Sequence, residues 1–273
     1  MRMILMAASA ALLVTLALAA PTRASRADAH ALRVMTFNIQ HGIDGSHKYN
    51  LQRAIDVIAK IQPDIVGLQE VTRNHPYYNC DDQPAKIAAG LRSATGRVWA
   101  VAYEQEWFTP NVECRDSGRG DGKETEGLAF FAPADTLGPS STVALPVSRI
   151  AFAVKLPSAD GLPIVVTHLA SGKQNAEARR KEIAALMPWV EKLGPSSILM
   201  GDFNAAPDEA EMQPLLARYH DAGGPPTHGT HRIDYVLYRG EGLTLERVEA
   251  VDTKSWFGAA ASDHAPLLAS FKR

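Results

Sequence analysis

Short apolar runs with the length of β-strands recur along the chain. They are LRVMTFN at 32–38, DIVGLQE at 64–70, VWAVAYE at 98–104, GLAFFA at 127–132, RIAFAVKL at 149–156, LPIVVTHL at 162–169, SSILMGDFN at 196–204, RIDYVLY at 232–238 and PLLASF at 266–271. Several carry consecutive apolar residues instead of an alternation with polar ones, which is typical of strands covered on both faces. The pattern therefore predicts sheets whose two faces are both buried.

Two segments between these runs have apolar residues at helical spacing. We expect Asn50 to cap the first helix and Pro63 to end it, and Pro188 should kink the second. Their apolar faces consist of Leu51, Ala54, Ile55 and Ile58, and of Ile183, Leu186, Met187 and Val190. Because strands follow one another over 142–168 without a helix between them, the pattern predicts an α/β fold with two packed, mixed sheets flanked by helices.

The first 29 residues differ from the rest of the chain. Arg2 precedes the apolar run MILMAASAALLVTLALAA, and small residues that resemble an export cleavage site lie at the end of this run, at 17–19, and beyond it, at 27–29. We interpret residues 1–29 as a cleavable signal peptide, which predicts a periplasmic or extracellular location. An uncleaved membrane anchor is the alternative, since the run is about long enough to span a bilayer. No repeat or linker divides residues 30–273, which we expect to form one domain.

The composition, with 46% hydrophobic and 21% charged residues, is that of a globular domain. If the mature chain begins at His30, it has 25 basic and 29 acidic side chains, a net charge of -4. This balance lacks the basic footprint of tight, nonspecific nucleic-acid binding, although a bound cation can offset charge locally in a nuclease. It implies no stable protein partner, and we expect a monomer.

Two cysteines, Cys80 and Cys114, lie in the polar, loop-like segments YYNCDD and VECRDS. In an exported chain such a pair favours a disulfide, and unpaired surface thiols are the alternative. Neither cysteine has the neighbouring Cys or His that a zinc site needs.

Polar side chains stand where many of the predicted strands begin or end. They are Asn38, Glu70, His168, Asp202, Asn204, Asp234, Asp263 and His264. A single residue of this kind is usually a turn or cap residue. Several carboxylates at one rim would repel one another unless a cation lies among them, and oxygen ligands without a cysteine cluster favour a hard ion such as Mg²⁺ or Mn²⁺.

Seven short motifs, taken in order, resemble the endonuclease/exonuclease/phosphatase superfamily, whose members are similar to deoxyribonuclease I. The motifs are TFNIQ, DIVGLQEV, EGLAFF, VVTHL, GDFN, RIDYVL and ASDHAP. They span nearly all of the chain after the export segment, and the ordered set is specific although each motif is short. The resemblance implies a four-layered α/β sandwich with the active site at the edge where the two sheets meet.

The resemblance implies that a metal ion and a water molecule are held among four of these residues. Glu70 would be the principal metal ligand, with Asn38 beside it and Asp263 as a further ligand. Asp202 would orient or deprotonate the attacking water, or assist the leaving oxygen.

The other four residues would handle the phosphate and the proton. Asn204 and His168 would hydrogen-bond the phosphoryl oxygens, and Asp234 would pair with His264 as an acid/base dyad. Metal, amide and dyad together supply the charge clamp, aligned water and proton path that phosphoester hydrolysis needs.

Gln40 departs from the pattern of one branch of the superfamily. It stands where abasic-site endonucleases carry an acidic metal ligand, so its presence argues against the repair branch. We therefore expect one strong cation site, for Mg²⁺ with Mn²⁺ as a substitute.

Two further pairs are candidates for function. Trp256 and Phe257 lie a few residues before Asp263 and would contact the substrate if their loop is exposed, whereas core packing is the alternative. His228 and His231 could form a metal pair, but in a Gly- and Pro-rich loop a structural or solvent role is the simpler interpretation.

The sequence thus predicts an exported, Mg²⁺-dependent phosphodiesterase, with DNA as the first substrate to test. The alternatives on the same fold are a phospholipid phosphodiesterase of sphingomyelinase type and a phosphomonoesterase. A secreted binding protein without turnover agrees least with the retained polar positions.

Overall fold

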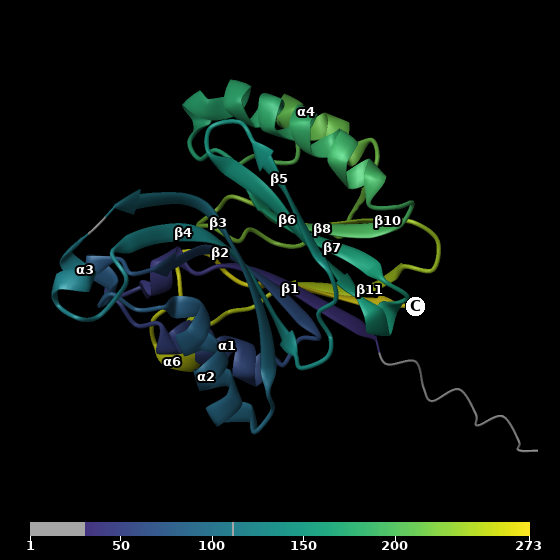
Figure 1. The fold of residues 1–273 in the computed structure, drawn as a ribbon. Helices are drawn as coiled ribbons and strands as arrows, with labels where there is room; N and C mark the ends of the chain where they lie inside the picture. Colours follow the sequence, from purple (N-terminus) through teal and green to yellow (C-terminus); the bar gives the residue numbers. More distant parts are fainter. Residues whose placement is uncertain (1–30, 111) are drawn as a thin grey trace, which may run out of the picture. The chain divides into compact units, whose positions relative to one another are not determined.

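Two six-stranded sheets form the centre of the protein (Figure 1). The structure is a computed structural model and describes residues 31–110 and 112–273. The predicted signal peptide lies outside the described residues. No helix within the described part of the chain has the length and apolar character needed to cross a membrane.

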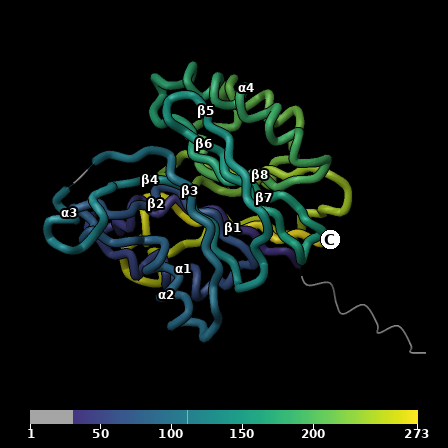
Figure 2. The backbone as a smooth tube through the Cα atoms, in the orientation of Figure 1, coloured from purple at the N-terminus to yellow at the C-terminus, as the bar shows by residue number. Residues whose placement is uncertain are grey.

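The first sheet combines strands from both ends of the chain. Its order is β11 (Thr244–Ala250), β12 (Leu267–Lys272), β1 (Leu32–Asn38), β2 (Ile65–Arg73), β4 (Lys123–Pro133) and β3 (Trp99–Pro110). The strand β1 pairs in parallel with β2 and antiparallel with β12, so the sheet is mixed. Figure 2 shows the purple β1 tube beside the yellow C-terminal segment.

The second sheet is built from the middle of the chain and is also mixed. Its order is β5 (Ser140–Leu145), β6 (Arg149–Leu156), β7 (Leu162–His168), β8 (Ser197–Asp202), β10 (Asp234–Arg239) and β9 (His220–Asp221). The strands β7 and β8 are parallel, and the register places His168 opposite Asp202. This register brings two of the predicted site residues side by side.

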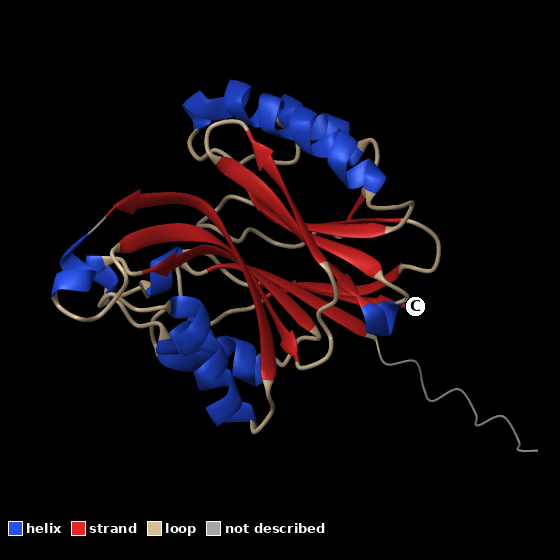
Figure 3. Ribbon diagram, viewed as in Figure 1, coloured by secondary structure: helices blue, strands red, loops and turns tan. Residues whose placement is uncertain are grey.

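Helices cover the outer faces of both sheets (Figure 3). The longer ones are α1 (Gln52–Ile61), α2 (Gln83–Thr95) and α4 (Ala176–Lys192), and the short ones are α3 (Val112–Asp116), α5 (Gln213–Leu216) and α6 (Lys254–Phe257). Single 3-10 turns span Gln40–Gly42, Pro76–Tyr78, Pro157–Ala159, Lys173–Asn175 and Ala210–Met212. The predicted fold, two packed mixed sheets flanked by helices, is confirmed.

Three apolar clusters hold these four layers together. The cluster between the sheets includes Val34, Phe130, Phe152, Val166 and Met200. The other two lie under α1 and α2 on the first sheet and under α4 on the second. Both faces of the central strands are therefore buried, as their continuous apolar sequences predict.

The two predicted helices are present, with one correction at a cap. The helix α1 begins at Gln52, its N-cap position is Leu51, and no side chain caps it. Asn50 lies one residue before the N-cap: its backbone carbonyl accepts from Arg53 N at 3.0 Å, and its side-chain amide donates to Asp44 Oδ2 at 3.3 Å. The helix α4 contains Pro188 and continues beyond it to Lys192.

The disulfide between Cys80 and Cys114 is present, with Cα atoms 5.5 Å apart and a sequence separation of 34. It joins the segment after β2 to α3, where both cysteines are buried. The Sγ atom of Cys114 also lies 3.0 Å from the carbonyl oxygen of Asn74. The bridge therefore ties two loops to the end of β2.

Removing this disulfide should destabilise the protein. In the chain-entropy description, a closed loop of this length contributes on the order of 3 kcal/mol. Replacing both cysteines with alanine should lower the urea midpoint accordingly, and a reducing agent should lower the midpoint of the wild type but not of the double variant. An identical midpoint for the wild type and the double variant would contradict this expectation.

Candidate active site

The predicted site residues come together at one edge of the sandwich. Asn38, His168 and Asp202 are the last residues of β1, β7 and β8, and Asp234 is the first of β10. His264 lies three residues before β12. All five side chains are buried, so they form a polar cluster within the core at this edge of the sandwich.

Glu70 reaches this cluster because β2 is irregular at that point. The pairing of β2 with β4 shifts register between Leu68 and Val71, and Glu70 has a left-handed backbone with φ of 56°. Such a bulge re-aims a side chain, and a non-glycine residue in this conformation commonly marks a functional position. The Glu70 carboxylate accepts a hydrogen bond from Asn38 Nδ2 at 2.9 Å.

Asn38 links the carboxylates of the two sheets. Its Nδ2 group donates to Glu70 Oε1 in the first sheet and, at 3.2 Å, to Asp202 Oδ2 in the second. Its Oδ1 atom accepts the backbone N–H of Gln40 at 3.0 Å. The amide thus fixes the spacing between Glu70 and Asp202, and its predicted role as a metal ligand stays a prediction.

Asp202 and Asn204 lie together at the end of β8. Asp202 Oδ1 accepts the backbone N–H of Asn204 at 2.9 Å, and Asn204 Nδ2 donates to the Leu169 carbonyl at 3.0 Å. Burial and the nearby Asp234 carboxylate raise the pKa of Asp202 to about 7. Asp202 is therefore set up to exchange a proton near neutral pH.

Asp234 and His264 form the predicted pair. The distance from His264 Nδ1 to Asp234 Oδ2 is 2.8 Å, which leaves Nε2 facing Asp202 Oδ2 at 3.7 Å. Burial opposes the charge on His264, yet the hydrogen bond and the carboxylates of Asp234 and Asp202 raise its pKa to about 10. His264 therefore holds a proton on the ring atom that faces the cluster.

His168 presents a neutral imidazole. Its Nδ1 atom lies 3.2 Å from Arg149 Nη1, and because arginine can only donate, Nδ1 accepts and the proton is on Nε2. Burial and the Arg149 charge lower the pKa of His168 well below its usual range. The Nε2–H group faces Asp202 at 3.6 Å and Glu70 at 4.0 Å, where it can donate to a bound oxygen.

Asp263 stands at the outer rim and is 39% exposed. Gln40 Nε2 donates to its Oδ2 at 2.8 Å, so the residue that stands in place of a further carboxylate hydrogen-bonds Asp263. The neighbouring Ser262 hydroxyl donates to the Asn38 carbonyl at 2.8 Å. This contact holds the loop that carries Asp263 and His264 against the end of β1.

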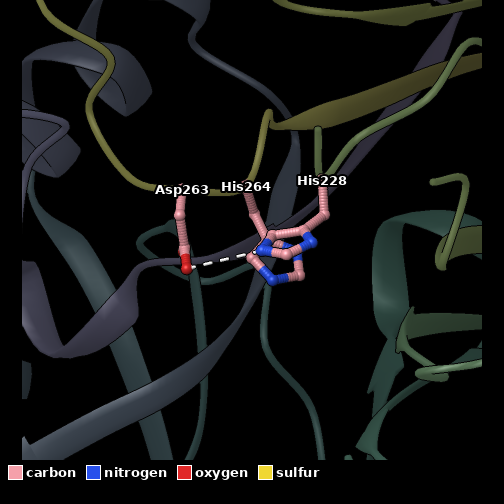
Figure 4. A group of neighbouring side chains, drawn as sticks. All are labelled: His228, Asp263 and His264. Atoms are coloured by element: carbon pink, nitrogen blue, oxygen red, sulfur yellow. Dashed lines mark ion pairs between the residues drawn. The ribbon is translucent and has the colours of Figure 1, made fainter. Parts of the chain in front are cut away.

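His228 joins the site, and our interpretation of it as a structural or solvent residue missed this. Its Nε2 atom lies 3.6 Å from Asp263 Oδ2, and its ring lies 4.6 Å from that of His264 (Figure 4). The backbone of His228 bridges to His264 as well as to His231, whose side chain is exposed. Only the folding of the 225–231 loop onto the last motif creates this contact.

His41 and Arg149 also lie in the site although no motif includes them. His41 Nε2 is 3.2 Å from Glu70 Oε2, and its ring stacks on Tyr78 at 5.2 Å. Arg149 Nη1 is 3.2 Å from Glu106 Oε2, whose pKa burial raises to about 8 against the effect of Arg149. The available signal for Arg149 was a charged residue directly before the apolar run IAFAV.

Trp256 and Phe257 pack on the first sheet's helical side. Both are half-buried against the cluster under α1, with Lys60 Nζ 4.0 Å above the Trp256 ring and Arg53 4.6 Å above the Phe257 ring. These contacts agree with the packing alternative for the pair. A role in substrate binding stays a prediction.

The residues fit a hard divalent cation. Asp202 and Asp234 lie in a group of possible ligand atoms within 4.8 Å of one another, and Asp234 Oδ1 is buried without a hydrogen-bond partner, whereas the third member, His264, is held protonated by Asp234 and would not be a ligand. Glu70 adds a partly exposed carboxylate on the opposite sheet, linked through Asn38. Such a cation would relieve the repulsion among the carboxylates and supply charge to stabilise a phosphoryl transition state.

The arrangement suits phosphoester hydrolysis in which these side chains bind, orient and move protons. His168 and Asn204 can donate to non-bridging oxygens, while Asp202 can accept a proton from a water molecule. Protonated His264 can donate to an oxygen that gains charge. The fold and this set of groups define a phosphoesterase architecture.

The protein belongs to the Endonuclease/Exonuclease/phosphatase family, whose sequence profile matches residues 35–264. Members of this family are generally hydrolases that act on phosphoesters, commonly with divalent metals. A comparison with curated protein sequences found no match.

Solved structures share the fold at low sequence identity. An endonuclease/exonuclease/phosphatase from Beutenbergia cavernae is 22% identical with a TM-score of 0.68, covering 89% of this chain and 72% of that one. The human Nocturnin catalytic domain with bound sulfate is 22% identical with a TM-score of 0.65, covering 89% and 93%. A Bacteroides thetaiotaomicron mannosyl-6-phosphatase is 14% identical with a TM-score of 0.62, covering 89% and 100%.

Gly201 allows the approach of β7 and β8 that sets His168 beside Asp202. Its φ is 145°, and a Cβ atom there would lie 2.0 Å from the Thr167 carbonyl oxygen. Gly201→Ala should therefore destabilise the protein by at least about 2 kcal/mol, from backbone strain and a clash with backbone.

Thermal unfolding checks this prediction with Gly194→Ala as the matched control. Gly194 has a similar φ of 136° but nothing within 4 Å of the added Cβ. Gly201→Ala should lower the melting temperature more than Gly194→Ala does. Equal shifts would show that the close approach at Thr167 carries no cost.

Proposed function

We propose that this protein is an exported, Mg²⁺-dependent hydrolase of phosphate esters. The observation that carries the proposal is the meeting of Glu70, Asp202 and the Asp234–His264 pair at one edge of the sandwich, with Asn38 bridging the sheets. Oxygen ligands of this kind favour Mg²⁺ or Mn²⁺, and one strong site is expected because Gln40 occupies the position of a further carboxylate. Export rests on the N-terminal sequence alone.

DNA as substrate rests on the resemblance to deoxyribonuclease I-like phosphodiesterases. A second candidate, a small phosphomonoester, is favoured by Arg149 beside the site, because its Nη1 is already engaged by Glu106 and His168 and so offers fewer donors to the backbone of a nucleic acid. A mannosyl-6-phosphatase with the same fold supports the view that this architecture serves such esters.

The test is a panel of phosphoesters assayed with purified mature protein. Nitrophenyl phosphate, bis-nitrophenyl phosphate, plasmid DNA, RNA and sphingomyelin vesicles would each be incubated with chelator, Mg²⁺ or Mn²⁺. We expect turnover that chelator abolishes and either ion restores. Full activity in excess chelator would overturn metal dependence, and no turnover of any ester would overturn the hydrolase proposal.

A further inference from the structure

A polar pocket of about 270 Å³ opens directly beside the catalytic cluster. Its lining includes Trp107, Glu126, Ser148, Arg149, Ser171 and Asn175. Arg149 connects pocket and site, since its Nη1 lies 3.2 Å from His168 Nδ1. Ser171 follows His168 by three positions on the loop after β7. A group attached to a phosphate in the site can therefore extend into this pocket.

The pocket wall is held in place by pairing between its own charged and aromatic groups. Trp107 and Glu126 are cross-strand partners on β3 and β4, which places the indole beside the Glu126 carboxylate. Glu126 Oε2 also lies 3.6 Å from His41 Nδ1. On the other side, Arg149 is fixed by Glu106, whose side chain is 0% exposed. The carboxylate and the guanidinium are thus positioned before any ligand arrives.

This lining matches a ring that carries several hydroxyl groups. A carboxylate accepts hydroxyl hydrogens, a guanidinium donates to hydroxyl oxygens, and serine hydroxyls and an asparagine amide can do either. The indole supplies an apolar surface for the C–H face of a ring. The volume is just below the range of about 300–1,000 Å³ typical of drug-sized ligands, so one ring fits better than an oligomer.

We propose that the pocket formed by Trp107, Glu126, Arg149, Ser171 and Asn175 binds the hydroxylated ring of a sugar or cyclitol phosphate ester. The inference rests on the proposed phosphoester hydrolysis and names the substrate class of that site. An ammonium headgroup fits less well because Arg149 lines the same pocket. A polynucleotide fits less well because a pocket of about 270 Å³ holds one ring and not a strand.

The test compares three esters that differ in the alcohol. Inositol phosphate has a hydroxylated ring, cyclohexyl phosphate has the same ring without hydroxyls, and ethyl phosphate has no ring. We expect kcat/KM to fall in this order: each missing hydrogen bond should lower it about three- to tenfold, and the ethyl ester also lacks the ring face that would pack on the Trp107 indole. Asn175→Ala should lower kcat/KM for inositol phosphate by about three- to tenfold and leave ethyl phosphate unchanged. Trp107→Ala should lower kcat/KM for both inositol phosphate and cyclohexyl phosphate.

The matched control for Trp107→Ala is Phe108→Ala. Phe108 is the next residue on β3, is 57% exposed and points to the opposite face. Its replacement should therefore leave kcat/KM unchanged for all three esters. Equal kcat/KM for inositol and cyclohexyl phosphate would overturn the proposal, as would a preference for phosphocholine or DNA over the hydroxylated ring.

A binding measurement separates the pocket from the chemistry. Calorimetric titration of inositol phosphate into His264→Ala in Mg²⁺ should show binding that a second change, Asn175→Ala, weakens by about three- to tenfold. If no ester is hydrolysed but this binding persists, the hydrolase proposal fails and the ring site stands. If esters are hydrolysed but Asn175→Ala changes neither binding nor selectivity, the ring site is wrong and the hydrolase stands.

Discussion

Glu70→Gln should lower kcat/KM for phosphoester hydrolysis at least about a hundredfold. Glutamine keeps the size of the side chain and can still accept from Asn38, but it removes the negative charge that the bulge in β2 aims at the site. A hard cation binds a neutral amide oxygen less tightly than a carboxylate, so the variant should need more Mg²⁺ for half-maximal activity. Initial rates over a Mg²⁺ series measure both effects.

The control for this variant is Glu104→Gln, which removes a carboxylate from the same sheet. Glu104 lies on β3, where it accepts from the Thr142 hydroxyl at 3.2 Å outside the catalytic cluster. Its variant should keep the wild-type rate and the wild-type Mg²⁺ requirement. Wild-type activity of Glu70→Gln at low Mg²⁺ would show that Glu70 is not a metal ligand.

His264→Ala should lower kcat by about 10²–10⁴-fold, the range typical for loss of a general acid or base. The imidazole carries its proton between Asp234 and Asp202, so alanine removes the donor for an oxygen that gains charge. Asp234→Asn should act in the same direction because it removes the negative charge that helps to keep the His264 imidazole protonated and oriented. Single-turnover rates at saturating substrate measure the chemical step.

His231→Ala is the matched control for the His264 variant. The His231 side chain is exposed, and its backbone, not its side chain, bridges to His228. We expect it to retain wild-type kcat and melting temperature. A His264→Ala enzyme that keeps full kcat while folding normally would assign proton transfer to another group.

The central strands could be predicted because their sequences are locally unambiguous. LRVMTFN and RIAFAVKL coincide with β1 and β6, since continuous apolar β-forming residues leave little choice when both faces are buried. The edge strand β11 was missed because TLERVEA is half polar and gains its strand conformation by pairing with β12. The Asn50 cap was wrong because the helix starts one residue later than expected, with Leu51 at the N-cap position and only the backbone carbonyl of Asn50 accepting from Arg53.

The sequence by itself determined which polar groups stand at strand ends and, through their order, the family of the protein. Tertiary structure decided the rest of the site, because its contacts join residues far apart in the chain. Asn38 and Asp202 are 164 positions apart in the chain and form their hydrogen bond only because the two sheets pack together. Glu70 points into the same cluster only because β2 has a bulge at that position. The contact of His228 with Asp263 and the pocket at Trp107 likewise join segments that are distant in the chain. Nothing in the sequence of one such segment indicates which other segment it contacts. Spacing along a chain sets the period of an element, whereas packing between elements sets which side chains meet.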